Sequence, residues 1–210
     1  MLSFREMINS ESACGRQADV TVKNNKNKQM KKCIIVVVLL LGTTTLFAQT
    51  INWVSMDEAL ALQQKAPKKI LIDMYTSWCG PCKMLDRNTF TNKDLIAFVN
   101  EHYYAVKFNA EGNEVVNFKD QKFSNPNYKP EMAKRRNSQH ELTRFLGVNA
   151  YPTMVFLGLD AELLAPIPGY QTAQQLELYL KLFKDDTYKE MNNQEAFNGY
   201  YKAFVPSFMP

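Results

Sequence analysis

An apolar run that leads directly into a cysteine pair constrains this chain most. Residues 70–75 (ILIDMY) suit a central strand that is buried on both faces, and Cys79-Gly80-Pro81-Cys82 follows three residues later. Gly80 permits a tight approach of the two thiols and Pro81 suits the first turn of a helix. The sequence therefore predicts a strand, a short turn and a helix that begins at the cysteine pair.

This placement gives the two cysteines different predicted roles. A free thiol has a pKa near 8.5, and the amides and dipole at a helix N-terminus stabilise a thiolate there. Cys79, just before the helix, is expected to be the exposed attacking thiol. Cys82, one turn into the helix, is expected to resolve the mixed disulfide. A metal site is not expected, because the mature chain offers only this pair and two histidines, without zinc-ligand spacing.

The N-terminus is predicted to be a leader, residues 1–48. Lys31-Lys32 precede a short apolar run, residues 33–41, and Ala48 ends a segment of the kind that signal peptidases cut. The predicted signal peptide spans 30–48, with Met30 as a candidate start and an uncleaved membrane anchor as the alternative. Residues 1–32 hold seven of the basic residues and three acids, so they account for the whole net charge of +4. The remainder is near neutral, and no nucleic-acid partner is expected.

Beyond the leader, the pattern predicts an α/β fold with three layers and a central mixed sheet. Helices are expected in the second half of residues 51–66, at 82–88, from 91 to 99 and after Thr172, and a further one over roughly 130–146. Strands are expected at 103–108 and 153–157, with an edge strand at 162–168. Residues 110–146 are predicted to be a long irregular insertion in a domain spanning 49–185. Residues 186–210 form an aromatic C-terminal extension, which is expected to pack against the domain.

The segment ILIDMYTSWCGPCK resembles the active-site strand and motif of the thioredoxin superfamily, and GVNAYPT (147–153) resembles its cis-proline loop. An interruption at 88–92 makes the motif helix more similar to exported thioredoxin-like proteins and to the C-terminal domain of the bacterial transmembrane reductant conductor. The resemblance covers about residues 51–184 and implies a thioredoxin fold with an insertion before the cis-proline loop.

The resemblance also implies site residues. Asp73 would exchange a proton with Cys82, and Lys107 would tune that carboxylate. Pro152, if cis, would place the backbone of Tyr151 against Cys79 and the substrate. The remaining substrate-binding residues implied are Trp78, Gly80 and Pro81.

The predicted function is an exported, periplasmic or secreted thiol–disulfide oxidoreductase that works without a cofactor. Gly-Pro between the cysteines places no charge near the thiolate, which favours a reductase. Its expected partners are disulfide-bearing secreted proteins and a membrane electron-donor protein, because the chain has no NADPH-binding motif, and family members are commonly monomers. The alternatives are a disulfide oxidase or isomerase, and a chaperone-like module that binds clients through the insertion and the aromatic tail.

Overall fold

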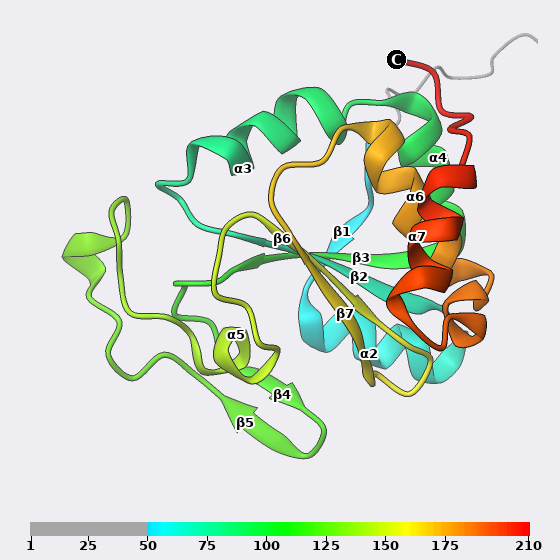
Figure 1. The fold of residues 1–210 in the computed structure, drawn as a ribbon. Coiled ribbons are helices and arrows are strands. Elements are labelled where there is room, and N and C mark those ends of the chain that lie inside the picture. The colour runs from blue at the N-terminus through cyan, green and yellow to red at the C-terminus, as the bar shows by residue number, and fades with distance from the viewer. Residues whose placement is uncertain (1–49) are drawn as a thin grey trace, which may run out of the picture. The chain divides into compact units, whose positions relative to one another are not determined.

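The computed structural model describes residues 50–210, and the predicted leader lies outside them. A five-stranded sheet forms the centre, in the order β1-β3-β2-β6-β7 (Figure 1). Strands β1, β3 and β2 are parallel, whereas β6 and β7 run antiparallel to their neighbours. The strands are β1 (Trp53–Val54), β2 (Lys69–Tyr75), β3 (Tyr103–Asn109), β6 (Thr153–Leu157) and β7 (Leu163–Pro168).

Helices cover both faces of this sheet, which confirms the three-layer α/β prediction. The helices are α2 (Met56–Lys65), α3 (Gly80–Met84), α4 (Lys93–His102), α5 (Glu141–Phe145), α6 (Ala173–Lys184) and α7 (Gln194–Ala203). Side chains of α4 and α6 pack on one face, and side chains of α2 and α5 pack on the other. Strand β2 is consequently buried on both faces, as its apolar run predicts. Within the described part of the chain, no helix is both long and apolar enough to cross a bilayer.

The motif helix has a different form from the continuous helix predicted over 82–88. It comprises the short α3 and a π-helical turn, η1 (Leu85–Thr89), in which the Phe90 amide donates to the Leu85 carbonyl at 2.9 Å. Helix α4 then starts anew, with the side chain of Asn92 accepting a hydrogen bond from the Leu95 amide at 3.0 Å. The interruption expected at 88–92 is therefore present, and one widened turn precedes it.

The insertion, residues 110–146, is more ordered than predicted. Strands β4 (Val116–Phe118) and β5 (Gln121–Phe123) form a hairpin whose two turn residues, Lys119 and Asp120, both have positive φ angles of 50° and 61°. Asn-Gly or Asp-Gly usually marks such a turn and Lys-Asp does not, so no turn signal predicts this hairpin. Buried Phe118 anchors the hairpin to the core.

The helix predicted over roughly 130–146 is wrong in extent. Only a single 3₁₀ turn, η2 (Pro130–Met132), and α5 are helical, so Arg135 and Arg136 lie on no helix. The segment between η2 and α5 has no buried apolar residue that would hold a helix on the core. Polar groups of this segment instead form hydrogen bonds with residues of the site described below.

The C-terminal segment folds back on the domain. After α6 come a 3₁₀ turn, η3 (Thr187–Glu190), and α7, which has no buried residue. The tail beyond α7 is nevertheless anchored, because Phe208 is buried in the cluster under α4 and α6.

Candidate active site

The cysteine pair sits at the start of the motif helix and forms a disulfide, with Cα atoms 5.3 Å apart. Cys79 is the N-cap of α3, and its Sγ accepts a hydrogen bond from the Cys82 amide at 3.1 Å. Pro81 occupies the first turn, where its missing N–H costs no hydrogen bond. The local sequence thus builds the strand, turn and helix that the motif predicts.

The prediction that Cys79 is the exposed cysteine is wrong for this oxidised form. Cys79 is 2% exposed and Cys82 is 3% exposed, so the two are equally buried. The sulfur of Cys79 faces the first turn of α3 and is bonded to its partner there, which turns it away from solvent. Gly80 and Pro81, between them, are exposed.

A buried carboxyl group lies on the strand that leads into the motif. Asp73 of β2 is directly beside Lys107 of β3 in the strand register, and Lys107 Nζ donates to Asp73 Oδ2 at 3.1 Å. Burial raises the pKa of Asp73 to about 6, and the nearby Lys107 only partly offsets that rise. Oδ1 of Asp73 accepts no hydrogen bond from residues 50–210.

Lys107 is held between two carboxylates, since Asp86 of η1 also accepts a hydrogen bond from its ammonium group. The ammonium lies 5.2 Å from the ring centroids of both Trp53 and Tyr75. Burial alone would lower the pKa of Lys107, but the two carboxylates outweigh it and the pKa is raised. The lysine therefore stays charged beside Asp73.

Trp78, the residue before Cys79, contacts the loop before β6. The peptide bond between Tyr151 and Pro152 is cis, as the resemblance implies. The ring of Trp78 packs edge-on against that of Tyr151, with 6.1 Å between centroids. Trp78 Nε1 donates to Glu111 Oε2 at 2.7 Å.

The structure thus groups the predicted residues on β2, α3, β3 and the cis-proline loop, and it adds three that lie outside the predicted set of site residues: Asp86, Glu111 and Arg136. Asp86 lies four residues after Cys82, so helical spacing was an available signal. Glu111 and Arg136 reach Trp78 from the insertion, and no sequence pattern links positions so far apart.

The histidines play no visible part in this arrangement. His140, the residue before α5, is fully buried, with Nδ1 accepting from the Leu142 amide and Nε2 bound to the Glu114 carbonyl. It is the N-cap of α5, and its ring packs edge-on against that of Phe108. Among residues 50–210, no three His, Cys, Asp or Glu side chains come together as a metal site.

The sequence of this chain matches a known protein family. The family model described as a thioredoxin-like domain matches residues 56–184, which is more than half of the chain. The chain belongs to the thioredoxin-like domain family. Thiol–disulfide exchange is the chemistry that this membership and the Cys79–Cys82 pair support.

Individual relatives agree with this assignment. The thiol:disulfide interchange protein DsbD of Pectobacterium atrosepticum is 23% identical over 139 residues. That match covers 65% of this chain and 20% of the relative, so the chain corresponds to about a fifth of that longer protein. A thioredoxin-fold protein from Helicobacter pylori shares 19% identity with a TM-score of 0.50, and the match covers 65% of this chain and 81% of that one. The latter likeness concerns the fold.

Proposed function

We propose that this chain is an exported protein-disulfide reductase whose active groups are Cys79 and Cys82. The uncharged Gly80-Pro81 dipeptide between the two cysteines carries this proposal. A positive charge at that place would stabilise the thiolate, and with it the reduced form, which makes a stronger oxidant. Without such a charge, the dithiol gives up its electrons more readily.

The first step forms a mixed disulfide. The thiolate of Cys79 attacks one sulfur of the substrate disulfide, and the bond between the two substrate sulfurs breaks. The released substrate thiolate takes a proton from solvent. Trp78 precedes Cys79 and packs on Tyr151 of the cis-proline loop, which supports the proposal that Trp78, Tyr151 and Pro152 form the surface against which the substrate chain would lie.

The second step releases the product. The thiolate of Cys82 attacks the Cys79 sulfur, which forms the intramolecular disulfide and expels the second substrate thiolate. Two electrons and two protons pass from the dithiol to the substrate in total. Asp73 is suited to accept the proton of Cys82, because its pKa of about 6 lies close to neutral pH. Lys107 would favour the ionised carboxylate.

Renewed turnover needs a partner that reduces the Cys79–Cys82 disulfide. The sequence contains no nucleotide-binding motif, so a dithiol protein at the membrane is the proposed electron donor. Disulfide-bearing secreted or periplasmic proteins are the proposed substrates. The predicted signal peptide, residues 30–48, supports export, and the chain would act as a monomer without a cofactor or nucleic acid.

The test is the reduction potential of the Cys79–Cys82 pair, measured in the full chain by equilibration against a dithiol buffer. We expect a value near that of thioredoxin, about −270 mV. A value near −120 mV, typical of a strong disulfide oxidant, would contradict a reductase and favour the oxidase or isomerase alternative. Replacing both cysteines with Ser tests the chaperone alternative, because a client-binding module would keep its effect on clients and a reductase would lose it.

A further inference from the structure

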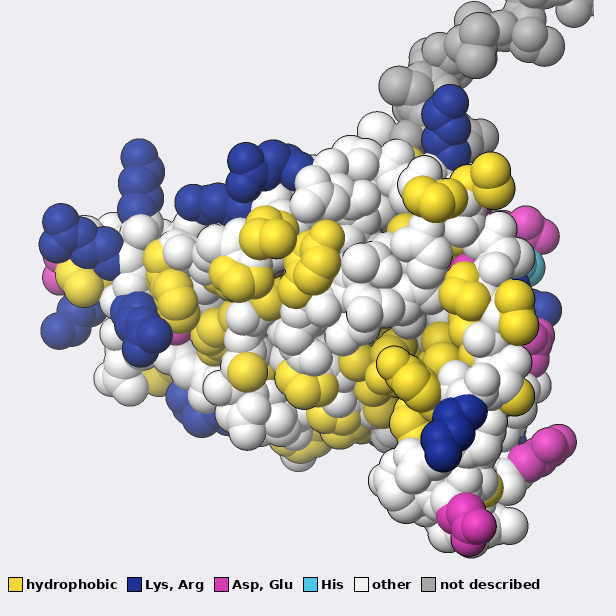
Figure 2. All heavy atoms as spheres, turned by 45° about the horizontal axis from the view of Figure 1, so that its top comes forward, with side chains coloured by type: hydrophobic (Ala, Val, Ile, Leu, Met, Phe, Trp, Pro, Cys, Tyr) yellow, Lys and Arg dark blue, Asp and Glu magenta, His cyan; other side chains and the backbone are white. Residues whose placement is uncertain are grey.

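The insertion places a cluster of cationic side chains beside the disulfide. The segment from residue 129 to 136 holds one acidic side chain, Glu131, and four basic side chains, all exposed: Lys129, Lys134, Arg135 and Arg136. Within residues 50–210, none of these four forms an ion pair with a carboxylate. Figure 2 shows Lys and Arg side chains gathered at the insertion end of the molecule, next to an exposed hydrophobic area.

This segment is fixed to the active-site motif rather than hanging free. Ser77 Oγ donates to the Ala133 carbonyl at 2.6 Å, and the Asn137 amide donates to Glu111 Oε2 at 2.8 Å. The same carboxylate oxygen accepts from Trp78 Nε1. The segment is therefore held on both sides of Arg136 by groups that also hold the residues next to Cys79.

A second set of bonds closes the segment on itself. The side chain of Asn137 accepts from the Lys129 amide at 3.0 Å and donates to the Lys129 carbonyl at 2.8 Å. The two ends of the basic segment are thus joined by one side chain. Pre-organisation of this kind lowers the entropy lost when a ligand binds.

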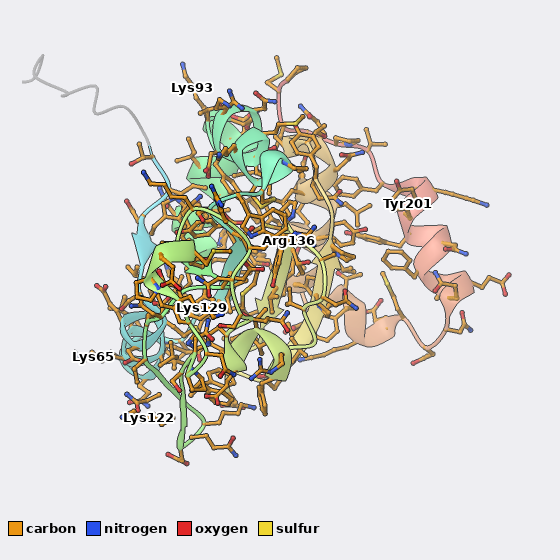
Figure 3. All side chains as sticks on the ribbon, turned by 90° about the vertical axis from the view of Figure 1, so that its left-hand side faces the viewer. Lys65, Lys93, Lys122, Lys129, Arg136 and Tyr201 are labelled. Atoms are coloured by element: carbon orange, nitrogen blue, oxygen red, sulfur yellow. A yellow bond between two sulfur atoms is a disulfide. The ribbon has the colours of Figure 1, made fainter. Side chains whose placement is uncertain are left out.

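Of these four basic side chains, Arg136 is the one that stacks on Trp78, the residue before Cys79. Its guanidinium lies over the Trp78 ring, 4.6 Å from the centroid, and it donates no hydrogen bond to any residue from 50 to 210. Stacking uses the face of the guanidinium and leaves the in-plane N–H groups free to bind a carboxylate. In Figure 3, where the insertion side faces the viewer, Arg136 and Lys129 are labelled on the same side of the molecule.

A pocket of about 360 Å³ is lined by Arg136 together with Trp78, Glu111 and the loop that leads to the cis-proline, residues 149–151. Glu111 would repel an anion inside this pocket, although one of its oxygens is already bound to Trp78 and Asn137. Arg136 and its basic neighbours are exposed to solvent. We therefore expect a ligand anion to bind on the exposed side of Arg136, while the substrate main chain passes the cis-proline loop.

We propose that Arg136 and its basic neighbours select substrates that carry Asp or Glu close to the disulfide to be attacked. This inference rests on the proposed thiol–disulfide exchange and adds the substrate class. The carboxylate of the substrate would bind the free edge of the Arg136 guanidinium. The added contact would steer encounter and lengthen the lifetime of the complex before sulfur exchange.

The test compares two disulfide-linked peptides that differ only in carrying Glu or Gln beside the cysteine. Each peptide is offered to the full chain in both directions: the oxidised peptide to the reduced chain, and the reduced peptide to the oxidised chain. We expect the Glu peptide to react about fivefold faster in both, and the ratio to fall towards one in Arg136→Gln and at high salt. Arg136→Lys should keep part of the preference, because it keeps the charge and loses the planar stack.

Lys122→Gln is the matched control, since it removes the same charge from β5 of the insertion, well away from Arg136 in Figure 3. It should leave the ratio unchanged. Equal rates for the two peptides, or an equal loss in Lys122→Gln, would overturn the substrate preference while leaving the reductase proposal standing. Exchange in the oxidising direction alone, with the Glu peptide still faster, would support the preference and contradict the reductase. No exchange in either direction would overturn both.

Discussion

At the scale of single residues, Asp73 is the active-site carboxyl group whose pKa departs clearly from its ordinary value. It is buried on β2, with one oxygen bound to Lys107 and the other without a hydrogen bond from the described residues. Its pKa of about 6 lies above the ordinary value of 3.8. The folded chain therefore binds this proton more tightly than the unfolded chain does, and the contribution of Asp73 to stability falls as the pH rises from about 4 to about 6.

We expect Asp73→Asn to stabilise the chain at pH 7 by about 3 kcal/mol, since each unit of pKa difference is worth about 1.4 kcal/mol. The gain should vanish below pH 4, where Asp73 is protonated in both states. Urea unfolding of the oxidised chain from pH 3.5 to 7.5 measures it. Asp86→Asn is the matched control, because it removes the exposed carboxyl from the same lysine and leaves Asp73 in place. Parallel stability curves for Asp73→Asn and the unchanged chain would contradict the buried, proton-binding role.

The sequence predicted this part of the site well and the insertion side poorly. Cys79, Cys82 and the strand carrying Asp73 form one short segment, so their proximity follows from strand and helix geometry. The pairing of Asp73 with Lys107 follows from the register of two neighbouring parallel strands. Glu111 and Arg136 reach Trp78 only because the insertion folds over the motif, and that packing depends on tertiary contacts that a local pattern does not contain.

At the scale of elements, predictions held where a cap and a periodic apolar face coincided. Helix α6 begins at Thr172 with a complete capping box: the Gln175 amide donates to Thr172 Oγ1 at 3.2 Å, and the Thr172 amide donates to Gln175 Oε1 at 2.8 Å. Helix α2 has the matching Ser55 cap. The hairpin β4–β5 had no such signal, because three-residue strands are too short to show alternation and the Lys-Asp turn is unusual.

We expect Thr172→Ala to lower the free energy of unfolding by about 1 kcal/mol, because the Gln175 amide loses its partner at the start of α6. Thr172→Ser keeps the hydroxyl and serves as the control. Urea denaturation of both variants and the unchanged chain, all in the oxidised form, measures the difference. If Ser proves as damaging as Ala, the hydroxyl contact contributes nothing and the loss has another source.

At the scale of the whole molecule, the C-terminal tail joins helices that are far apart in sequence. Glu177 of α6 is fully buried, and its carboxylate accepts hydrogen bonds from the amides of Ser207 and Phe208 and from Lys181 Nζ at 2.6 Å. The Met209 amide donates to Asp94 Oδ2 of α4 at 2.8 Å. Burial by itself would raise the pKa of Glu177, but these donors outweigh it and hold the pKa below its usual value.

We expect Glu177→Gln to loosen the tail, because the replacement loses the charge and one of the two accepting oxygens. Hydrogen exchange at the Ser207 and Phe208 amides should accelerate on the order of tenfold. The same loosening should follow in the unchanged chain as the pH falls through the depressed pKa of Glu177. Glu195→Gln, on the exposed face of α7, removes an equal charge without touching the tail. Unchanged exchange in Glu177→Gln would show that Phe208 packing alone holds the tail.

The insertion leaves the sheet and returns to it at one point. The carbonyl of Ala110, the first residue of the insertion, accepts hydrogen bonds from the His140 amide at 2.9 Å and from Thr143 Oγ1 at 3.0 Å. The two stems are thus fastened together, and the free energy of closing a loop grows only slowly with its length. The exposed part of a segment joined at its stems can therefore be lengthened or shortened at small cost, provided that buried anchors such as Phe118 are kept. Under the proposed scheme, substitutions on the insertion would change the choice of substrate while the cysteine pair keeps its chemistry.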